Sequence, residues 1–467
     1  MNLQAAGTEV RPGAQPGAQP ETPPGAQPGA LPGALPGGRS WRRALLWLIL
    51  LGALFYSTYT TTNWLASQRA HVPSVVFGWE ALIPLLAWTI LPYWSINLFY
   101  IASVFVCATR AELDRHARRL LTTQILAITC FLVAPLRFTL EKPPLDGLTG
   151  LMFDALASFD RPFNQAPSLH IALLVVLWVL FARHVPRWAL WPLHLWFALI
   201  GVSVLTTWQH HFIDLPTGAW LGLFVLWLWP DQGASPLAGA GWAVDPRRRR
   251  LALIYSAAGA ALAAVAFAQG GAALWLLWPA ASLLLVATTY AWLGPQAFQK
   301  GADGRLSLAA RGLFGPYLWG ARLNTRFWKG DGRPQAALCD GVSLGRLPPP
   351  AAAASYTTVV DLTGELPGRA GSAGYVAVPM LDLATPPPGA LREAAMAIER
   401  ARADGTVLVC CALGYSRSAA AAATWLVMTG RAPNAQAAIA QIREVRPHIM
   451  LGDASRAAIA AAVEPSP

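Results

Sequence analysis

The chain of 467 residues is 55% hydrophobic and only 13% charged, whereas about a quarter of the residues of a soluble protein are charged. This shortage of charge, together with 21 tryptophans, argues against a wholly soluble protein and indicates a chain that lies largely in a bilayer. Nucleic acid is not expected as a partner despite the net charge of +11, because the Lys and Arg residues fall in short clusters between apolar runs, as in cytoplasmic loops. The five cysteines show no paired spacing, which argues against a secreted disulfide scaffold.

Residues 1–40 repeat Pro, Gly, Ala and Gln, as in "PGAQPGA". This composition cannot supply a core, so a disordered tail is predicted. The basic cluster "RSWRR" and a long apolar run follow. Because the run is long and has no clear cleavage site, it is interpreted as a membrane anchor and not as a signal peptide.

Eight apolar stretches are long enough, or nearly so, to cross a bilayer as helices. They lie at about 44–62, 93–109, 120–139, 169–183, 188–206, 212–230, 251–269 and 272–293. The further segment "VFGWEALIPLLAWTILP" at 76–92 is either a ninth crossing or a half-helix at the interface.

The positive-inside rule decides between eight and nine crossings. Four basic clusters should face the cytoplasm: "RSWRR", "TRAELDRHARR", "ARHVPR" and "DPRRRR". Eight crossings satisfy all four if residues 76–92 lie at the outer interface. Loops 140–168 and 207–211 then face outward, and everything after residue 294 is cytoplasmic.

Both of these outward loops lead into helices that begin with histidines. His170 follows the helix-start residue Ser168 in "PSLHIALL", and the free N–H groups and dipole of such a helix end favour an anion. His210 and Asp214 are spaced i, i+4 and share one helix face. Asp214 can therefore fix the tautomer of His210, whose other nitrogen can attack phosphorus while His170 protonates the leaving oxygen.

Interfacial polar residues that anchor helix ends are the alternative interpretation of these histidines. His211 is a poorer nucleophile candidate, because its partner at the same spacing is Leu215.

The motif "PSLH", followed some forty residues later by "HxxxD", resembles the type 2 phosphatidic acid phosphatase superfamily, nearer to its inositol-phosphoceramide-synthase-like branch. The resemblance covers roughly residues 76–230 and implies a six-helix membrane bundle. It implies His210 as the nucleophile that forms a phosphohistidine, Asp214 as its orienting residue and His170 as the general acid.

The chain departs from that superfamily at two positions. Leu169 stands where many members have glycine, and Val204 stands where the phosphatase branch has an arginine. Other cations must then hold the phosphate, and the candidates are Arg137, Lys142 and Arg161. Because the arginine is missing, transfer of a phospho-headgroup to another alcohol stays open as an alternative to hydrolysis.

The membrane part is thus expected to comprise a bundle at 41–230 and two further helices at 231–294. Residues 295–335 mix Lys and Arg with Leu, Phe, Trp and Tyr, which suits a membrane-surface segment. An ordinary linker is the alternative.

From residue 336 to 467 the sequence has the pattern of a soluble α/β domain. Strands are predicted in "DGVSLGRLP", "YTTVVDLTGEL", "YVAVPML" and "TVLVCC". Helices are predicted in "PGALREAAMAIERARADG", closed by Gly405, at 418–430, and in "NAQAAIAQIREVRP", begun by Asn434.

The segment "VCCALGYSRSA" joins the last strand to a helix and carries the strongest catalytic pattern. Between Cys411 and Arg417 lie five residues: Ala412, Leu413, Gly414, Tyr415 and Ser416. The N–H groups of such a loop form an oxyanion nest, which together with the helix dipole favours a thiolate. Arg417 can bind two phosphate oxygens, and Ser418 can donate a hydrogen bond to the sulfur. A buried core cysteine is the alternative for a lone Cys-x5-Arg pattern.

The stretches "VVDLTGEL", "VPMLD" and "VCCALGYSRSA" resemble the dual-specificity branch of the protein tyrosine phosphatases, over roughly residues 336–463. The resemblance implies Cys411 as the nucleophile, Arg417 as the phosphate clamp, Ser418 as the helper of the leaving sulfur and Asp382 as the general acid. Asp361 is the rival acid, although within its motif it is better suited to cap a strand end.

Cys410 stands where that family usually has histidine. It is either a buried, inert residue, which we favour, or a redox partner of Cys411. A reactive thiolate survives best in a reducing compartment, which agrees with a cytoplasmic location.

The order of the two parts resembles bacterial inner-membrane fusion proteins. The sequence therefore predicts a polytopic helical membrane bundle, with a six-helix core and two extra helices, followed by a soluble α/β cysteine-phosphatase domain in the cytoplasm. The predicted function is a bifunctional membrane phosphatase whose outward site acts on lipid phosphates and whose cytoplasmic site acts on a phospholipid or a phosphoprotein. Membrane lipids are the expected partners, and no cofactor or metal ion is expected.

Two alternative functions stay open. The bundle can be a headgroup phosphotransferase with an accessory phosphatase, or the chain can be a transporter or sensor whose C-terminal domain only binds phosphorylated ligands. A pure binder has no need of both a nucleophile and an acid, so Cys411 and Asp382 argue against the second alternative.

Overall fold

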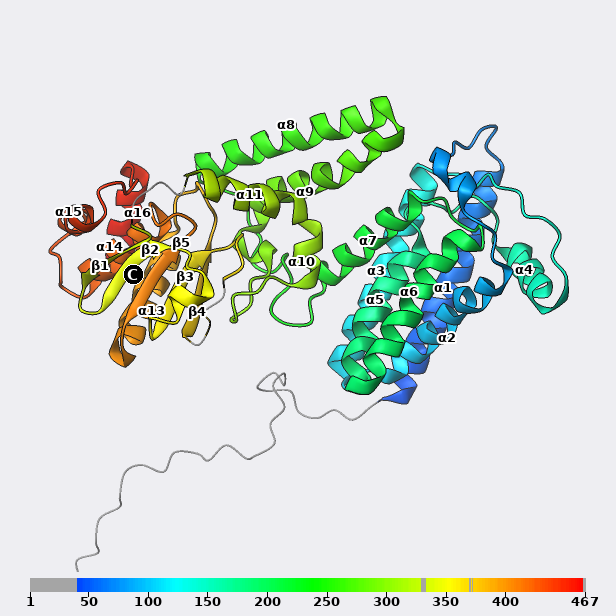
Figure 1. Cartoon of the computed structure of the whole chain (residues 1–467), viewed down its shortest axis with the longest axis horizontal. Coiled ribbons are helices and arrows are strands. Elements are labelled where there is room, and N and C mark those ends of the chain that lie inside the picture. Colours follow the sequence, from blue (N-terminus) through cyan, green and yellow to red (C-terminus); the bar gives the residue numbers. More distant parts are fainter. Residues whose placement is uncertain (1–39, 329–332, 369–370, 372, 465–467) are drawn as a thin grey trace, which may run out of the picture.

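The computed structural model describes residues 40–328, 333–368, 371 and 373–464. The predicted disordered tail lies outside the described residues except for Ser40. The chain forms a helical region and an α/β domain at opposite ends of an elongated molecule, and a pair of long helices lies between them (Figure 1).

The helical region follows the apolar pattern of the sequence. Its helices are α1 (Trp41–Ser67), α2 (Ile90–Val106), α3 (Arg110–Val133), α4 (Gly147–Phe159), α5 (Leu169–His184), α6 (Leu190–Thr206), α7 (Asp214–Leu228), α8 (Pro246–Gln269) and α9 (Leu277–Thr288). Each of the eight predicted crossing segments overlaps one of these helices. The short helix α4, inside a loop that the sequence left without structure, was not predicted.

Within the described residues, five helical segments are long and apolar enough to cross a membrane. They are Trp41–Ser67, Ala87–Val106, Arg187–Thr206, Pro246–Gln269 and Gly271–Leu293, and the shorter apolar helices are α4, α5 and α7. Residues 76–92 form the 3-10 helices η1 (Gly78–Leu82) and η2 (Ala87–Thr89) and the start of α2. Such short pieces cannot span a bilayer as a crossing of their own.

One end of the helical region gathers three of the four basic clusters. Arg43 and Asp114 form an ion pair of 2.6 Å, and Asp231 is paired with Arg119 at 2.8 Å and with Arg183 at 2.9 Å. These ion pairs place the starts of α1 and α3, the end of α5 and the segment after α7 at the same end.

The opposite end gathers the histidine loops. His211 Nδ1 lies 2.8 Å from Glu80 Oε2, and the Trp208 indole donates to the Ile83 carbonyl at 3.1 Å. The tip of the α8–α9 hairpin reaches this end as well, since the Trp275 and Phe212 rings are 5.8 Å apart. Three of the basic clusters and the histidine loops therefore lie at opposite ends of the helices, and the orientation of the helices in a membrane stays a prediction.

Helices α5 and α7 pack closely because two glycines of α7 face α5. A Cβ atom on Gly218 would lie 2.5 Å from the Ser168 carbonyl oxygen, and one on Gly222 would lie 2.7 Å from Val175 Cβ. Small residues four apart are a common means of bringing membrane helices together. This close packing brings the start of α5 next to the start of α7, where the candidate histidines lie.

The α/β domain has one mixed sheet of five strands in the order β1-β2-β5-β3-β4. The strands are β1 (Gln335–Cys339), β2 (Val342–Arg346), β3 (Thr358–Thr363), β4 (Gly374–Met380) and β5 (Val407–Cys411). Only β1 runs antiparallel to its neighbour. The helices are α12 (Pro350–Ala353), α13 (Pro388–Asp404), α14 (Arg417–Met428), α15 (Ala435–Val445) and α16 (Asp453–Val463).

The four predicted strands and three predicted helices of this domain are confirmed, whereas β1 and α16 were not predicted. Asn434 begins α15 by accepting the Ala437 N–H at 2.9 Å, and Gly405 follows α13 with a φ of +147°. Both are the capping roles that these residue types favour.

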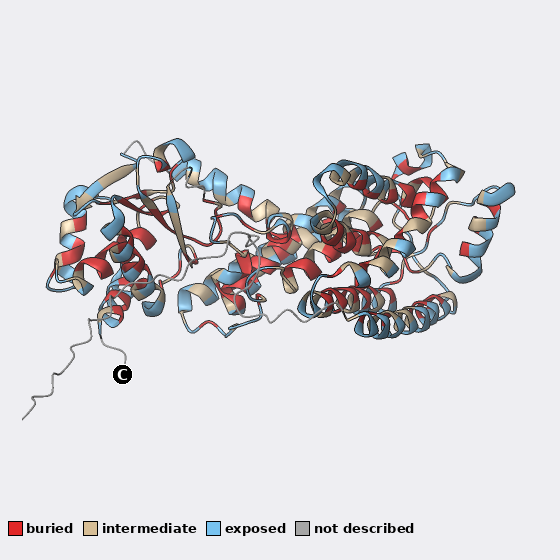
Figure 2. Cartoon of the chain, turned by 90° about the horizontal axis from the view of Figure 1, so that it is seen from below, coloured by how far each residue is buried: buried red, intermediate tan, exposed pale blue. Residues whose placement is uncertain are grey.

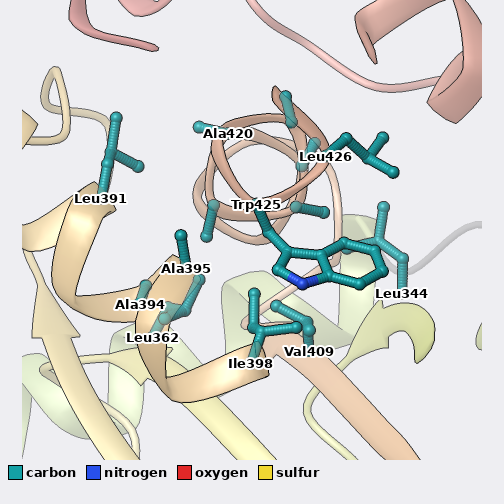
Figure 3. Close-up of a cluster of buried hydrophobic side chains, with 14 of the residues drawn as sticks. Leu344, Leu362, Leu391, Ala394, Ala395, Ile398, Val409, Ala420, Trp425 and Leu426 are labelled. Atoms are coloured by element: carbon teal, nitrogen blue, oxygen red, sulfur yellow. The ribbon is translucent and has the colours of Figure 1, made fainter. Parts of the chain in front are cut away.

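The main core of this domain lies between the sheet and the helices α13 to α16. Trp425 is completely buried there and packs among residues such as Leu344 and Ile398 (Figure 3). Strand β5 is buried along its whole length, as expected of a central parallel strand. Both parts of the chain contain buried residues, with exposed residues around them (Figure 2).

Residues 295–335 connect the two parts through η6 (Pro295–Phe298), α10 (Leu308–Leu313) and α11 (Gly315–Trp328). Phe298 and Phe314 are buried in a core that also contains Leu381 of the α/β domain. Lys300 donates to Asp361 at 2.5 Å, with both side chains completely buried. The first half of the predicted membrane-surface segment is therefore packed between the two parts. The second half, α11, exposes Trp319 and Phe327.

Candidate active site and a second histidine site

The cysteine loop is formed by the turn from β5 into α14. Cys411 is the last residue of β5 and Arg417 the first of α14. The Gly414 N–H donates to Cys411 Sγ at 3.3 Å, and Ser418 Oγ lies 3.3 Å from the same sulfur. A backbone N–H and a hydroxyl group thus converge on the sulfur.

The shape of the loop depends on Gly414. Its φ is +78°, and a Cβ atom there would lie 2.5 Å from the carbonyl carbon of Gly345. The loop carbonyls are engaged from outside: Arg446 Nε donates to the Gly414 carbonyl at 3.2 Å, and the Met450 N–H donates to the Tyr415 carbonyl at 2.8 Å. Because these carbonyls are bound from outside, the loop can turn its N–H groups toward an anion, as in an oxyanion nest.

Arg417 is held in place by Glu365, which follows β3. Its Nη1 and Nη2 lie 2.9 Å from the two carboxylate oxygens, and Nη1 also donates to the Met380 carbonyl at 3.0 Å. Burial opposes the ionisation of Glu365, but the charge and hydrogen bonds of Arg417 outweigh it and hold the pKa of Glu365 below its ordinary value. The guanidinium is therefore oriented before any substrate binds.

Asp382 lies on the loop after β4 and meets the same guanidinium. Its Oδ1 is 2.9 Å from Arg417 Nη2, and its side chain remains 39% exposed. The closely surrounding protein raises the pKa of Asp382, and the charge of Glu365 adds to this effect while Arg417 opposes it. A carboxyl group with a raised pKa beside the phosphate-binding arginine suits a general acid.

The rival acid Asp361 has a structural role. It is completely buried, and one oxygen accepts the Thr363 N–H at 2.8 Å while the other accepts from Lys300 and from the Tyr375 hydroxyl. Because of these contacts, the Asp361 carboxylate is fully paired inside the domain. This agrees with the choice of Asp382 over Asp361 as the general acid.

Cys410 and Cys411 face opposite sides of the sheet. Cys411 belongs to the main core, whereas Cys410 packs with Val359 and Leu408 on the other side. Burial raises the pKa of Cys410 well above its ordinary value, with Asp361 adding to the effect. The thiol of Cys410 is therefore kept neutral, which supports the interpretation of an inert residue.

The start of α7 brings His210 and Asp214 together. Their Nδ1 and Oδ2 atoms are 3.1 Å apart, and His210 Nε2 lies 3.2 Å from Ser168 Oγ at the start of α5. His170 stands in the first turn of α5, where its ring stacks on Tyr93 with centroids 4.3 Å apart. Within the described residues, the buried Nε2 of His170 has no hydrogen-bond partner.

Of the three cations proposed to hold phosphate at this second site, one lies near the histidines and two do not. Lys142 lies over the Phe138 and Phe153 rings, and Asp160 is within electrostatic reach of both Lys142 and His210. Arg161 instead donates to Ser67 at 3.1 Å and is exposed, as is Arg137. The structure thus connects Lys142 with the histidines, but not Arg137 or Arg161.

His211, the weaker nucleophile candidate, has other partners. Besides Glu80, it contacts Thr139 through Nε2 at 3.1 Å from both the backbone nitrogen and the side-chain oxygen. It therefore joins η1 to the segment after α3. Within the described residues, no group of three or more His, Cys, Asp or Glu side chains is placed to hold a metal ion.

Several residues of the cysteine site were missed by sequence reasoning. Glu365 and Arg446 lie far from the cysteine loop in sequence and have no local pattern that connects them with it. The only available signal for Glu365 was its place at the end of a predicted strand, where polar residues of parallel sheets collect.

Residues 345–461 match the family model described as the dual specificity phosphatase catalytic domain. That match does not reach the helical region, whose resemblance to the type 2 phosphatidic acid phosphatases stays a prediction. The comparison with curated proteins finds no match.

Three solved structures illustrate the similarity. The crystal structure of PTPMT1 in complex with PI(5)P is 17% identical, with a TM-score of 0.26, and covers 28% of this chain and 95% of that one. Tk-PTP in the active form is 22% identical, with a TM-score of 0.26, and covers 28% and 96%. Human DUSP28 is 22% identical, with a TM-score of 0.23, and covers 27% and 91%. The similarity to the dual specificity phosphatase catalytic domain thus covers residues 345–461, in the C-terminal part of the chain.

Proposed function

We propose that the chain hydrolyses phosphomonoesters at Cys411. The single observation that carries this proposal is the convergence of Gly414 N–H and Ser418 Oγ on the sulfur, in the same loop as the preoriented Arg417. A cysteine before a helix in the core needs neither these donors nor a buried arginine.

The reaction follows from the positions of these groups. The Cys411 thiolate attacks phosphorus while Arg417 holds two phosphate oxygens, and Asp382 gives its proton to the leaving oxygen. A phosphocysteine and a free alcohol result. Water, which loses a proton to the Asp382 carboxylate, then attacks phosphorus and releases inorganic phosphate, and Ser418 donates a hydrogen bond to the departing sulfur. Both proton transfers return the enzyme to its starting state.

We further propose that this site lies on the cytoplasmic side of a membrane and acts on a phospholipid. Three of the four basic clusters lie at the end of the helical region opposite the histidine loops, and the domain is attached to helices that can span a bilayer. Such attachment raises the local concentration of lipid headgroups over that of soluble phosphoproteins.

A second activity is proposed for the histidine site because His210 lies between Asp214 and Ser168. Asp214 can fix the tautomer of His210, which then attacks a lipid phosphate, and His170 protonates the leaving group. Transfer to another alcohol remains an alternative to hydrolysis at this site.

The test is phosphate release by the detergent-purified full chain from phospholipids and phosphopeptides. We compare the wild type with Cys411→Ser and His210→Ala, with His194→Ala as a control because His194 accepts a hydrogen bond from Trp178 away from both sites. Loss of all release in Cys411→Ser alone supports the cysteine site and leaves the histidine site as a transferase or inactive. If Cys411→Ser and His210→Ala each lose phosphate release from different substrates, two phosphatase sites are supported. A preference of the cysteine site for phosphopeptides contradicts the proposal that it acts on a phospholipid.

A further inference from the structure

The loop that carries Asp382 is bound from two sides by the α8–α9 hairpin. The Tyr290 hydroxyl, just after α9, donates to the Asp382 carbonyl at 3.0 Å. Asp245, just before α8, accepts the Thr385 N–H at 3.0 Å. Both anchors hold the backbone of the loop, and neither occupies the Asp382 carboxyl, which pairs with Arg417.

The two anchoring residues, Tyr290 and Asp245, are connected to each other within the hairpin. Arg248, in the first turn of α8, donates from Nε to the Tyr290 carbonyl at 3.0 Å, so both anchors are joined at the open end of the hairpin. Tyr290 is only 1% exposed. This open end of the hairpin lies beside the α/β domain, whereas its tip points away from it (Figure 1).

Apolar burial follows the same path. Leu381, next to Asp382, and Ala384, next to Thr385, are buried in a core with Tyr290 and Phe298. The loop that carries Asp382 therefore packs against the hairpin and the segment after it, whereas most loops are exposed at the surface.

The backbone between the two anchors has an unusual conformation. Leu383 has a φ of +55°, in the left-handed region that a leucine rarely adopts, and its side chain is 67% exposed. Such a conformation persists only where flanking contacts determine it. Here the contacts on both sides of Leu383 come from the hairpin.

We infer that the α8–α9 hairpin is a working part of the phosphatase site, in which Tyr290 and Asp245 fix the acid loop so that Asp382 meets the phosphate held by Arg417. This inference rests on the proposed cysteine-dependent hydrolysis. Tyr290 is a positioning residue that acts through Asp382.

The inference predicts which substrates depend on Tyr290. A poor leaving group such as the phenolate of phenyl phosphate needs the proton of Asp382 in the transition state, whereas p-nitrophenolate departs with little help. Mispositioning of the acid therefore slows the formation of the phosphocysteine from phenyl phosphate, but not from p-nitrophenyl phosphate. A general loss of structure slows both.

The test measures kcat and KM for both esters with the purified full chain. Tyr290→Phe removes the hydroxyl, and Asp245→Ser removes the contact with Thr385 while keeping an N-cap oxygen for α8. Tyr255→Phe is the matched control, because the described ring contacts of Tyr255 are with Tyr290 and Tyr317 of the same cluster. Asp382→Asn serves as the reference for complete loss of the acid.

We expect Tyr290→Phe and Asp245→Ser each to lower kcat/KM for phenyl phosphate about tenfold and to change kcat/KM for p-nitrophenyl phosphate by less than about twofold, because kcat/KM reports the formation of the phosphocysteine and not its hydrolysis. Neither should cause a further loss when combined with Asp382→Asn. Equal losses for both esters, or no loss for phenyl phosphate in both variants, overturn the inference. Turnover that survives in Cys411→Ser overturns the proposed function itself, whereas Cys411-dependent turnover that is insensitive to both anchor variants overturns only the role of the hairpin.

Discussion

The buried carboxylate of Glu365 binds the guanidinium of Arg417 through two contacts of 2.9 Å each. Arg417 is itself only 2% exposed. Since Asp382 occupies Nη2 of the same guanidinium, an arriving phosphate must displace the Asp382 carboxylate while Glu365 keeps the arginine in place. The resting site therefore holds its phosphate clamp rigidly and its acid loosely.

Replacement of Glu365 by glutamine tests the first half of this arrangement. Glu365→Gln keeps the shape of the side chain but removes the more buried of the two carboxylates that pair with Arg417, and breaking such a pair costs about 3 kcal/mol of stability. We expect a lower midpoint of thermal unfolding and a higher KM for phosphomonoesters. Glu399→Gln is the control, because Glu399 forms its ion pairs at the surface, where they contribute little. Equal midpoints for the two variants would contradict the assignment.

The stability of the Glu365 pair should depend on pH in a defined direction. The folded-state pKa of Glu365 is lowered, so the pair stabilises the fold above the ordinary glutamate pKa of about 4.3 and loses this contribution as the pH falls through the lowered value. The difference in unfolding midpoint between wild type and Glu365→Gln should therefore shrink only in acid, below about pH 4. A difference that is constant across acid pH would show that Glu365 does not stabilise the fold through its charge.

Asp382 should determine the alkaline limb of the pH–rate profile. Its pKa is raised, first by burial, and the acid is active only while protonated. We expect kcat for phenyl phosphate to fall as the pH rises through this pKa. Asp382→Asn should remove that limb and lower kcat by about 10²–10⁴-fold. The role of Asp382 is disproved by a profile in which the variant keeps the same alkaline limb.

Replacement of Gly414 tests the geometry of the cysteine loop, and a matched glycine distinguishes backbone strain from a steric clash of the added methyl group. Gly414→Ala places a methyl group 2.5 Å from the Gly345 carbonyl carbon, whereas Gly430, with a similar φ of +73°, has no atom within 4 Å of an added Cβ. Both alanines cost the strain of a left-handed backbone, about 1 kcal/mol, but only Gly414→Ala displaces the cysteine loop. We expect loss of activity in Gly414→Ala and near-normal kcat in Gly430→Ala. Similar kcat values in the two variants would show that the loop does not require this close approach.

Local patterns were sufficient to predict most of the elements. The run "TVLVCC" predicts the buried strand β5 because both of its faces are covered, and Asn434 and Gly405 mark helix ends through their own chemistry. Strand β1 was missed since only two of its five residues are large and apolar enough to resemble a strand. Helix α4 was missed because its 13 residues are too few to cross a bilayer.

The cysteine loop was predictable because its groups lie within eight residues of sequence, whereas its supports are distant. Glu365 is separated from Arg417 by 52 residues, and Tyr290 from Asp382 by 92. No periodicity reports such contacts, which depend on how the sheet and the hairpin pack. Charge alone suggested Arg137 and Arg161 for the histidine site, but both side chains are exposed, since long cations at helix ends can extend into solvent or headgroups.

The central claim is that Cys411 is the nucleophile, and its neighbour provides the control. Phosphate release from phenyl phosphate and from a phospholipid should be measured for the purified full chain, for Cys411→Ser and for Cys410→Ala. The account predicts that Cys411→Ser lowers the rate on phenyl phosphate at least about a thousandfold and forms no phosphocysteine during turnover. It also predicts that Cys410→Ala, on the opposite face of the sheet, keeps most of the rate and forms a phosphocysteine. Undiminished release by Cys411→Ser would contradict the account.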